Sequence, residues 1–250
     1  MESIQDCCAA NHANQNKRRA LLKGAGTCAA ALLTGLGFGP NVVEAAALTK
    51  SQRDALTPEQ VIEMMKKGNQ RFRSGKMKSQ DFLAQKRSTA PGQYPAAIIL
   101  GCIDSRAPAE IILDMGIGDT FNARVAGNIA NRDMLGSMEF ACAVAGAKVV
   151  LVMGHTACGA IKGAIDSVEL GNLTGLLDTI KPSVEATQFQ GDRTSKNDEF
   201  VDAVARSNVK HTVDAIRGNS TVLADLEKKK QIMIVGSMYD LHNGLVTFMN

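Results

Sequence analysis

The chain has 250 residues, 45% of them hydrophobic, and a formal net charge of +3. This length suits one ordinary domain or two small ones, and the hydrophobic fraction is sufficient for a buried core. The sequence has no Trp, only two Tyr and no dense stripe of Lys and Arg, so we expect no nucleic-acid partner.

Residues 1–47 are predicted to form an export leader. The twin arginine Arg18-Arg19 precedes an uncharged stretch, residues 24–39, that is rich in Ala, Leu and Gly, and Ala45-Ala46-Ala47 provides the small residues of a cleavage site. This order resembles a bacterial twin-arginine (Tat) signal peptide, which implies export to the periplasm after folding and a mature chain that begins near Leu48. The apolar stretch is shorter than the roughly 20 residues needed to span a bilayer, so we expect no stable membrane insertion after cleavage. An uncleaved leader that anchors the protein to the membrane stays open as the alternative.

The mature chain keeps only three of the six cysteines, because Cys7, Cys8 and Cys28 lie in the leader. An odd and sparse set of cysteines argues against a disulfide scaffold. Metal ligation is one reason for an exported protein to keep unpaired thiols. The three remaining cysteines are Cys102, Cys142 and Cys158.

The mature chain is predicted to begin with a helical arm. Thr57 fits the N-cap of a helix, Pro58 its first position, and Gln60 the third position of a capping box. Apolar residues then follow at near-helical spacing up to Gly75, where we expect the helical region to end.

Further along, short apolar runs alternate with longer helical sequence. The apolar runs predict buried strands at 94–100, 148–153 and 232–235, residues 120–125 predict a strand of mixed character, and a turn at 242–244 leads into a short last strand. Helices are predicted at 134–146, at 160–170 and over most of 173–229, with a break near Gly191. Because the strands lack strict alternation and are separated by helices, we expect one α/β domain over residues 48–250, with a mostly parallel central sheet flanked by helices.

Reactive side chains follow two of these predicted strands. Cys102-Ile103-Asp104-Ser105-Arg106 follows the first apolar run, and His155-Thr156-Ala157-Cys158-Gly159 follows the run at 148–153. Open α/β sheets bind their ligands at the carboxyl ends of the strands, so the two segments meet if the strands are neighbours. Two thiolates and an imidazole suit Zn2+, and a catalytic zinc site has three protein ligands.

These two segments resemble the metal-binding signature of the β-carbonic anhydrases, Cys-x-Asp-x-Arg followed 53 residues later by His-x-x-Cys-Gly. The resemblance covers nearly all of the mature chain. Further similar segments are Lys67–Phe72, Phe121–Asn128, Gly159–Gly163 and Tyr239–Leu241.

The resemblance implies a role for each matching residue. Cys102, His155 and Cys158 match the ligands of one zinc ion per subunit. Asp104 and Arg106 match a catalytic dyad, in which the Asp either binds the zinc as a fourth ligand in a closed form or pairs with the Arg. The residues that match substrate-binding positions are Gln93, which would orient the substrate, Phe121, which would line an apolar pocket, and Gly159, whose backbone amide would face the substrate.

The resemblance therefore implies a zinc lyase, a carbonate dehydratase that interconverts CO2 and bicarbonate by means of zinc-bound hydroxide. It also implies a homodimer or a larger homo-oligomer, since part of each pocket comes from a neighbouring subunit in this family. Two alternatives stay open. One is a hydrolase of the same fold that acts on CS2 or COS, and the other is a non-catalytic module that binds zinc or bicarbonate.

Overall fold

The computed structural model describes residues 43–44 and 46–249. The predicted leader therefore lies almost entirely outside the described residues. Its last part contains β1 (Val43–Glu44), which pairs in parallel with β2 (Ser79–Gln80). In the described part of the chain, no helix has both the length and the apolar character needed to cross a membrane.

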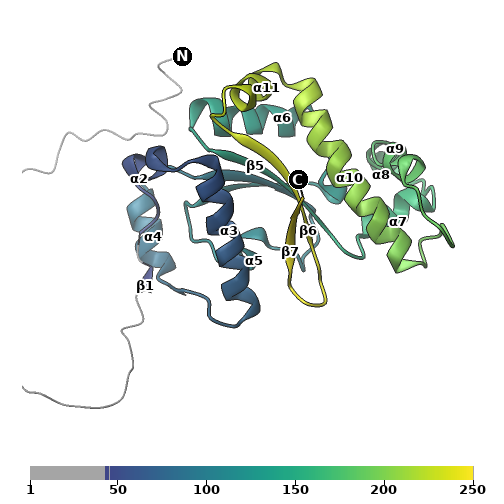
Figure 1. Ribbon diagram of the computed structural model, residues 1–250, viewed down its shortest axis with the longest axis horizontal. Coiled ribbons are helices and arrows are strands. Elements are labelled where there is room, and N and C mark those ends of the chain that lie inside the picture. The colour runs from purple at the N-terminus through teal and green to yellow at the C-terminus, as the bar shows by residue number, and fades with distance from the viewer. Residues whose placement is uncertain (1–42, 45, 250) are drawn as a thin grey trace, which may run out of the picture.

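A five-stranded sheet forms the centre of the fold, with the strand order β4-β3-β5-β6-β7. Four strands run parallel, and β7 at one edge runs antiparallel to β6 (Figure 1). This is the mostly parallel α/β sheet that the sequence predicts. The strands are β3 (Ala97–Gly101), β4 (Thr120–Arg124), β5 (Val149–His155), β6 (Met233–Tyr239) and β7 (Val246–Met249).

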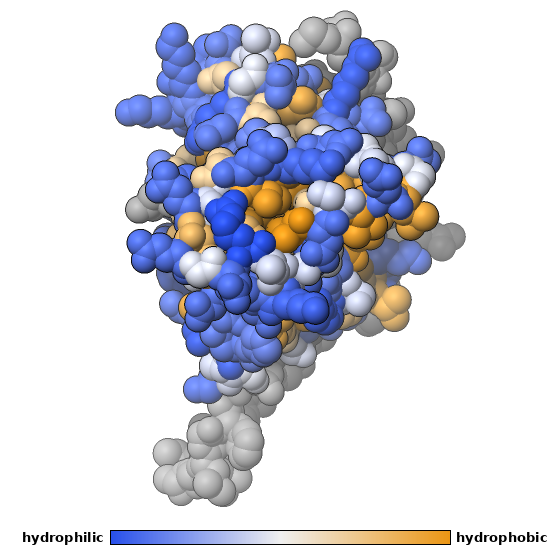
Figure 2. Space-filling view, turned by 90° about the vertical axis from the view of Figure 1, so that its right-hand side faces the viewer, coloured by the Kyte–Doolittle hydropathy of each residue, from blue (hydrophilic) through white to orange (hydrophobic). Residues whose placement is uncertain are grey.

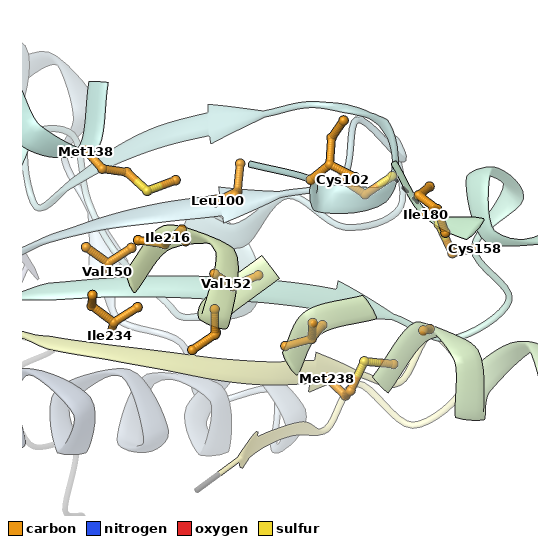
Figure 3. Packing of buried hydrophobic residues seen from close by; sticks show 14 of the residues in the cluster. Leu100, Cys102, Met138, Val150, Val152, Cys158, Ile180, Ile216, Ile234 and Met238 are labelled. Atoms are coloured by element: carbon orange, nitrogen blue, oxygen red, sulfur yellow. Dashed lines mark hydrogen bonds between the residues drawn. The ribbon is translucent and has the colours of Figure 1, made fainter. Parts of the chain in front are cut away.

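The two inner strands are buried on both faces, which explains why their sequence shows no alternation. Every residue of β3 and β5 is buried. On one face, Leu100, Val150 and Val152 belong to the same hydrophobic core as Ile216 of α10, and Figure 3 shows these side chains near one another. Fully burying an aliphatic side chain contributes about 1.5–3 kcal/mol, so this core holds the strand ends in fixed positions.

Helices cover both faces of the sheet. The core that contains Leu100 and Val152 also includes side chains from α6, α7, α10 and α11, whereas α3 and α5 cover the opposite face. The long helix α10 crosses the sheet close to the end where α7 begins (Figure 1). The helices are α2 (Lys50–Ala55), α3 (Pro58–Arg73), α4 (Phe82–Thr89), α5 (Ala109–Ile112), α6 (Arg132–Glu139), α7 (Gly159–Ile165), α8 (Gly171–Asp178), α9 (Lys181–Ala186), α10 (Asp198–Asn219) and α11 (Thr221–Lys228).

The predicted start of α3 is confirmed. Thr57 is the N-cap, its hydroxyl accepts a hydrogen bond from the Gln60 amide, and the Gln60 side chain accepts one in return from the Thr57 backbone. Pro58 occupies the first turn, where its missing N–H leaves no helical hydrogen bond unmade.

Several predicted helices differ in length from those in the structure. The segment predicted at 134–146 begins at Arg132, after the N-cap Asn131, and continues beyond α6 as a π-helical turn at Phe140–Val144. The helix predicted at 160–170 ends at Ile165, because Ser167 adopts a left-handed conformation with φ 52°. The long polar region divides into four helices, α8 to α11. The short helices α2, α4 and α5 were not predicted, since four to eight residues are too few for a periodic pattern.

Candidate metal centre

Two thiols and an imidazole meet at the carboxyl edge of the sheet. Cys102 directly follows β3, His155 is the last residue of β5, and Cys158 is the N-cap of α7. Because β3 and β5 are neighbouring parallel strands, these residues lie together, and their ligand atoms are all within 4.8 Å of one another. All three residues are buried. Figure 3 shows both cysteines beside Ile180 at one end of the apolar core.

The geometry of this cluster fits zinc. Cys102 Sγ and Cys158 Sγ lie 4.0 Å apart, and two sulfurs bound to zinc at about 2.3 Å in a tetrahedron would lie roughly 3.8 Å apart. His155 Nδ1 donates a hydrogen bond to the Thr156 carbonyl at 2.9 Å, which leaves the lone pair on Nε2. Among the described residues, buried Nε2 has no hydrogen-bond partner. A metal ion satisfies this atom, whose burial without a partner would otherwise be costly.

The electrostatics of the cluster also favour a cation. The Cys158 thiol donates a hydrogen bond that lowers the pKa of Cys102 to about 4. The same sharing of a proton, together with burial, raises the pKa of Cys158. Burial opposes the charged form of His155, but the nearby Cys102 sulfur and Thr156 carbonyl favour that form and raise the His155 pKa. Cys102 and Cys158 together therefore carry one negative charge, and the second thiol can also lose its proton only if a positive ion lies beside it.

The loop that carries Cys102 is held by the segment that follows β4. Arg124 Nε donates to the Cys102 carbonyl at 2.8 Å, and Arg124 Nη2 donates to the Asp104 carbonyl. The Gly127 amide donates to Cys102 Sγ at 3.4 Å. Gly127 has φ 69°, and a side chain there would place its Cβ 2.6 Å from Ile180 Cδ1. Glycine is therefore required for this amide to face the sulfur.

Asp104 lies beside the cluster and is paired with Arg106. Arg106 Nε and Nη2 donate to the two carboxylate oxygens at 3.0 and 2.8 Å, and the Arg106 amide donates to Oδ1 at 2.9 Å. These hydrogen bonds hold the pKa of Asp104 well below its usual range. Asp104 Oδ2 is 3.8 Å from His155 Nε2. Of the two arrangements that the resemblance implies, the structure contains the Asp–Arg pair.

The loop between β5 and α7 is held from two sides. The Ala157 amide donates to Asp202 Oδ1 of α10 at 2.9 Å, although Ala157 has the unfavourable φ of 53°. The Thr156 amide donates to the Tyr239 carbonyl, and the Leu241 amide donates to the Thr156 hydroxyl, both at 3.0 Å. These contacts fix the chain between His155 and Cys158.

Of the predicted substrate-binding residues, the structure brings only Gly159 to the cluster. Gly159 directly follows Cys158 and is exposed at the start of α7. Gln93 is exposed and precedes β3, whereas Cys102 follows that strand, so the two residues lie at opposite ends of it. Phe121 pairs in register with Ile98, four residues before Cys102, which corresponds to roughly 13 Å along a strand. Its ring contacts Phe140, with 6.2 Å between the ring centroids.

Three residues that hold the ligand loops were not predicted from the sequence as parts of the site. They are Arg124, Asp202 and Asn208, whose Nδ2 donates to the Gly127 carbonyl at 2.8 Å. Asp202 and Asn208 belong to a polar helical region that contains no motif, so only their folded positions reveal the contacts.

Figure 2, viewed from the side on which α7, α8 and α9 lie, shows an apolar hollow bordered by hydrophilic side chains.

Comparison with known proteins gives a consistent result. A family model described as "Carbonic anhydrase" matches residues 97–246. The chain is 34% identical over 186 residues to carbonic anhydrase 2 of Mycobacterium tuberculosis, which covers 72% of this chain and 87% of that protein. It is 32% identical to the carbonic anhydrase of Mycolicibacterium smegmatis, with 73% and 88% covered. A tetrameric β-carbonic anhydrase from Sordaria macrospora superposes with a TM-score of 0.57 and 26% identity, over 64% of this chain and 83% of that one. The chain belongs to the β-carbonic anhydrase family.

Proposed function

We propose that this protein is a zinc-dependent carbonic anhydrase, which hydrates CO2 reversibly to bicarbonate and a proton. The observation that carries this function is the meeting of Cys102, His155 and Cys158 at the carboxyl edge of the sheet, where the buried Nε2 of His155 has no hydrogen-bond partner in the part of the chain that the structure describes. When bound there, zinc supplies a Lewis acid that lowers the pKa of water, which makes a nucleophile available near neutral pH.

The ligand set suits a catalytic rather than a structural zinc site. Both oxygens of Asp104 are engaged by Arg106, so three protein ligands remain, which is the number found in catalytic sites. His155 keeps one tautomer, because its Nδ1 proton is donated to the Thr156 carbonyl.

Asp104 and Gly159 are proposed to orient the reactants. Asp104 stays ionised because Arg106 donates to it, and its Oδ2 lies on the side of the cluster that His155 Nε2 faces. There it accepts a hydrogen bond from the attacking water and directs the oxygen lone pair at the carbon of CO2. The Gly159 amide, at the start of α7, donates to an oxygen of the substrate. A Cβ built at Gly159 would meet no atom within 4 Å, so this position borders open space that the substrate can enter.

Gln93 and Phe121 are proposed to act in the site of a second copy of the chain. Neither reaches the cluster of its own chain, because the length of β3 separates Gln93 from Cys102 and Phe121 lies near the far end of β4. A homodimer or larger homo-oligomer, in which each chain gives these residues to its neighbour, makes the site complete. The tetrameric state of the Sordaria macrospora relative supports this assembly.

Comparing substrates tests the function directly. The zinc-loaded protein should hydrate CO2 much faster than it releases hydrogen sulfide from CS2 or COS, measured side by side with the same preparation. Rapid release of hydrogen sulfide without CO2 hydration would instead assign the site to a sulfur-substrate hydrolase. Stoichiometric zinc binding with turnover of none of these substrates would leave a binding module.

We also propose that the protein is exported through the twin-arginine route. The order of Arg18-Arg19, the uncharged stretch 24–39 and Ala45-Ala46-Ala47 supports this location. Cell fractionation should find a mature protein that begins near Leu48 in the periplasm. Full-length protein in the cytosol would contradict export, and full-length protein in the membrane fraction would show an uncleaved anchor.

A further inference from the structure

We propose that Asn208 of α10 is a positioning residue for the metal centre, which acts by aiming the Gly127 amide at the sulfur of Cys102. This inference deepens the proposed function, and it rests on Cys102 being a zinc ligand. It concerns how firmly the protein holds the metal and in what geometry, which can be measured without any measurement of CO2 turnover.

The turn that carries the Gly127 amide adopts an unusual backbone conformation. Two successive residues are left-handed, Gly127 with φ 69° and Asn128 with φ 44°. This conformation directs the Gly127 N–H towards Cys102 Sγ at 3.4 Å. Glycine adopts this conformation freely and asparagine tolerates it better than most residues, so the sequence permits the turn, and a contact from outside the turn can fix its orientation.

Asn208 provides that contact. Its Nδ2 donates to the Gly127 carbonyl at 2.8 Å, a link between residues 81 apart in the chain. The Gly127 residue is thus fixed on both sides, with its carbonyl bound by Asn208 and its amide directed at Cys102. A rotation of this short segment would release both hydrogen bonds together.

The place of Asn208 in the core indicates that its amide serves a specific purpose. Asn208 is 1% exposed and belongs to a helix whose buried side chains are mostly apolar, such as Val204 and Val209. Burial of an amide among such residues is unfavourable unless it makes hydrogen bonds. An aliphatic residue would fill the space equally well, but it would leave the Gly127 carbonyl without a donor.

The backbone of α10 holds Asn208 at a fixed height above the sheet. Its neighbour Val209 lies against Gly154 and Gly236, and a Cβ at either glycine would come within 2.6 Å of a Val209 methyl group. The helix therefore approaches β5 and β6 closely. On the far side, the Ser183 hydroxyl donates to Asn208 Oδ1 at 3.5 Å, which orients the amide so that Nδ2 faces Gly127.

A second buried asparagine provides a matched control. Asn69 of α3 is 3% exposed and also binds backbone groups, since its Nδ2 donates to the carbonyls of Ile112 and Gly244 and its Oδ1 accepts from the Val246 amide. It lies on the opposite face of the sheet among the core of α3 and α5. Its replacement reports the general cost of removing a buried, hydrogen-bonded amide.

The test compares Asn208→Leu and Asn208→Asp with Asn69→Leu in the full-length protein. Zinc affinity is measured by competition with a chelator, and the thiolate-to-metal absorption band is recorded after replacement of zinc by Co2+. Loss of an outer contact of this kind typically weakens metal binding about 10- to 100-fold. We expect such a loss, with a shifted Co2+ band, for both Asn208 variants, and wild-type zinc affinity for Asn69→Leu in spite of a lower melting temperature.

The inference is overturned if the Asn208 variants bind zinc and absorb with Co2+ like the wild type while they lose as much thermal stability as Asn69→Leu. If Asn208→Leu fails to fold, the nearly isosteric Asn208→Asp, which lacks the Nδ2 donor, decides the question. Failure of the proposed function gives a different pattern, namely a wild-type protein that binds zinc tightly but does not hydrate CO2.

Discussion

Cys102 Sγ and Cys158 Sγ lie 4.0 Å apart at the ends of two segments that the chain separates by 56 residues. At this distance the two thiols share one proton, which lowers the pKa of Cys102 to about 4 and raises that of Cys158. Thiol ligands must lose their protons when they bind zinc, so metal binding and protonation are linked at this pair.

Zinc binding should therefore release protons and weaken in acid. At pH 7 the proton held by Cys158 leaves, joined by that of any protonated His155, and we expect about one to two protons per zinc. Affinity should fall as the pH falls, and more steeply below about pH 4, where Cys102 also takes up a proton. A pH indicator in weakly buffered solution measures the release. Zinc binding at pH 7 without proton release would contradict the account. As a control, Cys142→Ala should release as many protons as the wild type, because Cys142 is not part of the cluster.

Replacement of Arg106 should lower the rate of CO2 hydration. The Arg106 guanidinium donates to both carboxylate oxygens of Asp104, which holds this side chain in place and lowers its pKa. Without Arg106 the pKa of Asp104 rises towards its ordinary value, which is still acidic, so at neutral pH the loss is one of orientation and not of charge.

We expect Arg106→Ala to lower kcat/KM at least 10-fold, in the range found for outer contacts of metal sites. Arg106→Lys should recover only part of the activity, since an ammonium group cannot form the two-pronged contact. A full pH–rate profile for each variant checks the prediction, and a wild-type kcat/KM for Arg106→Ala at neutral pH would contradict it.

Gln93 should act in trans. Gln93→Ala and Cys158→Ser proteins should each hydrate CO2 poorly, but a mixed dimer has one site with intact ligands and an intact Gln93 from the neighbouring chain. After subunit exchange in an equal mixture, activity should return to about a quarter of the wild-type level, because half of the dimers are mixed and each has one working site. No recovery, with mixed dimers shown to form, would place Gln93 in its own chain's site.

Asp202 should tolerate the loss of its charge but not of its oxygen. Burial is the main cause that raises its pKa, so its contribution favours the folded state in acid and is lost as the pH rises through the folded pKa. Asp202→Asn keeps an acceptor for the Ala157 amide without a buried charge. Its melting temperature, relative to the wild type, should therefore increase from acid to neutral pH, with zinc affinity retained. Asp202→Ala should bind zinc less tightly, and equal affinity in the two variants would contradict this anchoring role.

Local signals in the sequence were sufficient for the elements that depend on neighbouring residues. The capping box at Thr57 and Gln60 marks the start of α3, and the unbroken apolar runs mark β3 and β5. The ligand segments could be placed at one edge of the sheet because parallel strands end together.

The remaining features depend on contacts between distant parts of the chain. The contact of Asn208 with Gly127 joins residues that no local pattern relates, and the anchoring of Ala157 by Asp202 is of the same kind. The sequence alone also could not show that Gln93 lies at the far end of β3 from its own cluster, since that depends on where the strand begins and ends.

Stopped-flow CO2 hydration, with zinc quantified in the same samples, tests the central claim most directly. The Cys142 thiol is buried outside the cluster, and burial raises its pKa to about 12, so Cys142→Ala serves as a control. The wild type and Cys142→Ala should both bind one zinc per chain and hydrate CO2 rapidly. Cys158→Ser, a change of one atom within the cluster, should lose both zinc and turnover. Rapid, zinc-independent hydration by Cys158→Ser, or one zinc per chain without hydration in the wild type, would contradict the account.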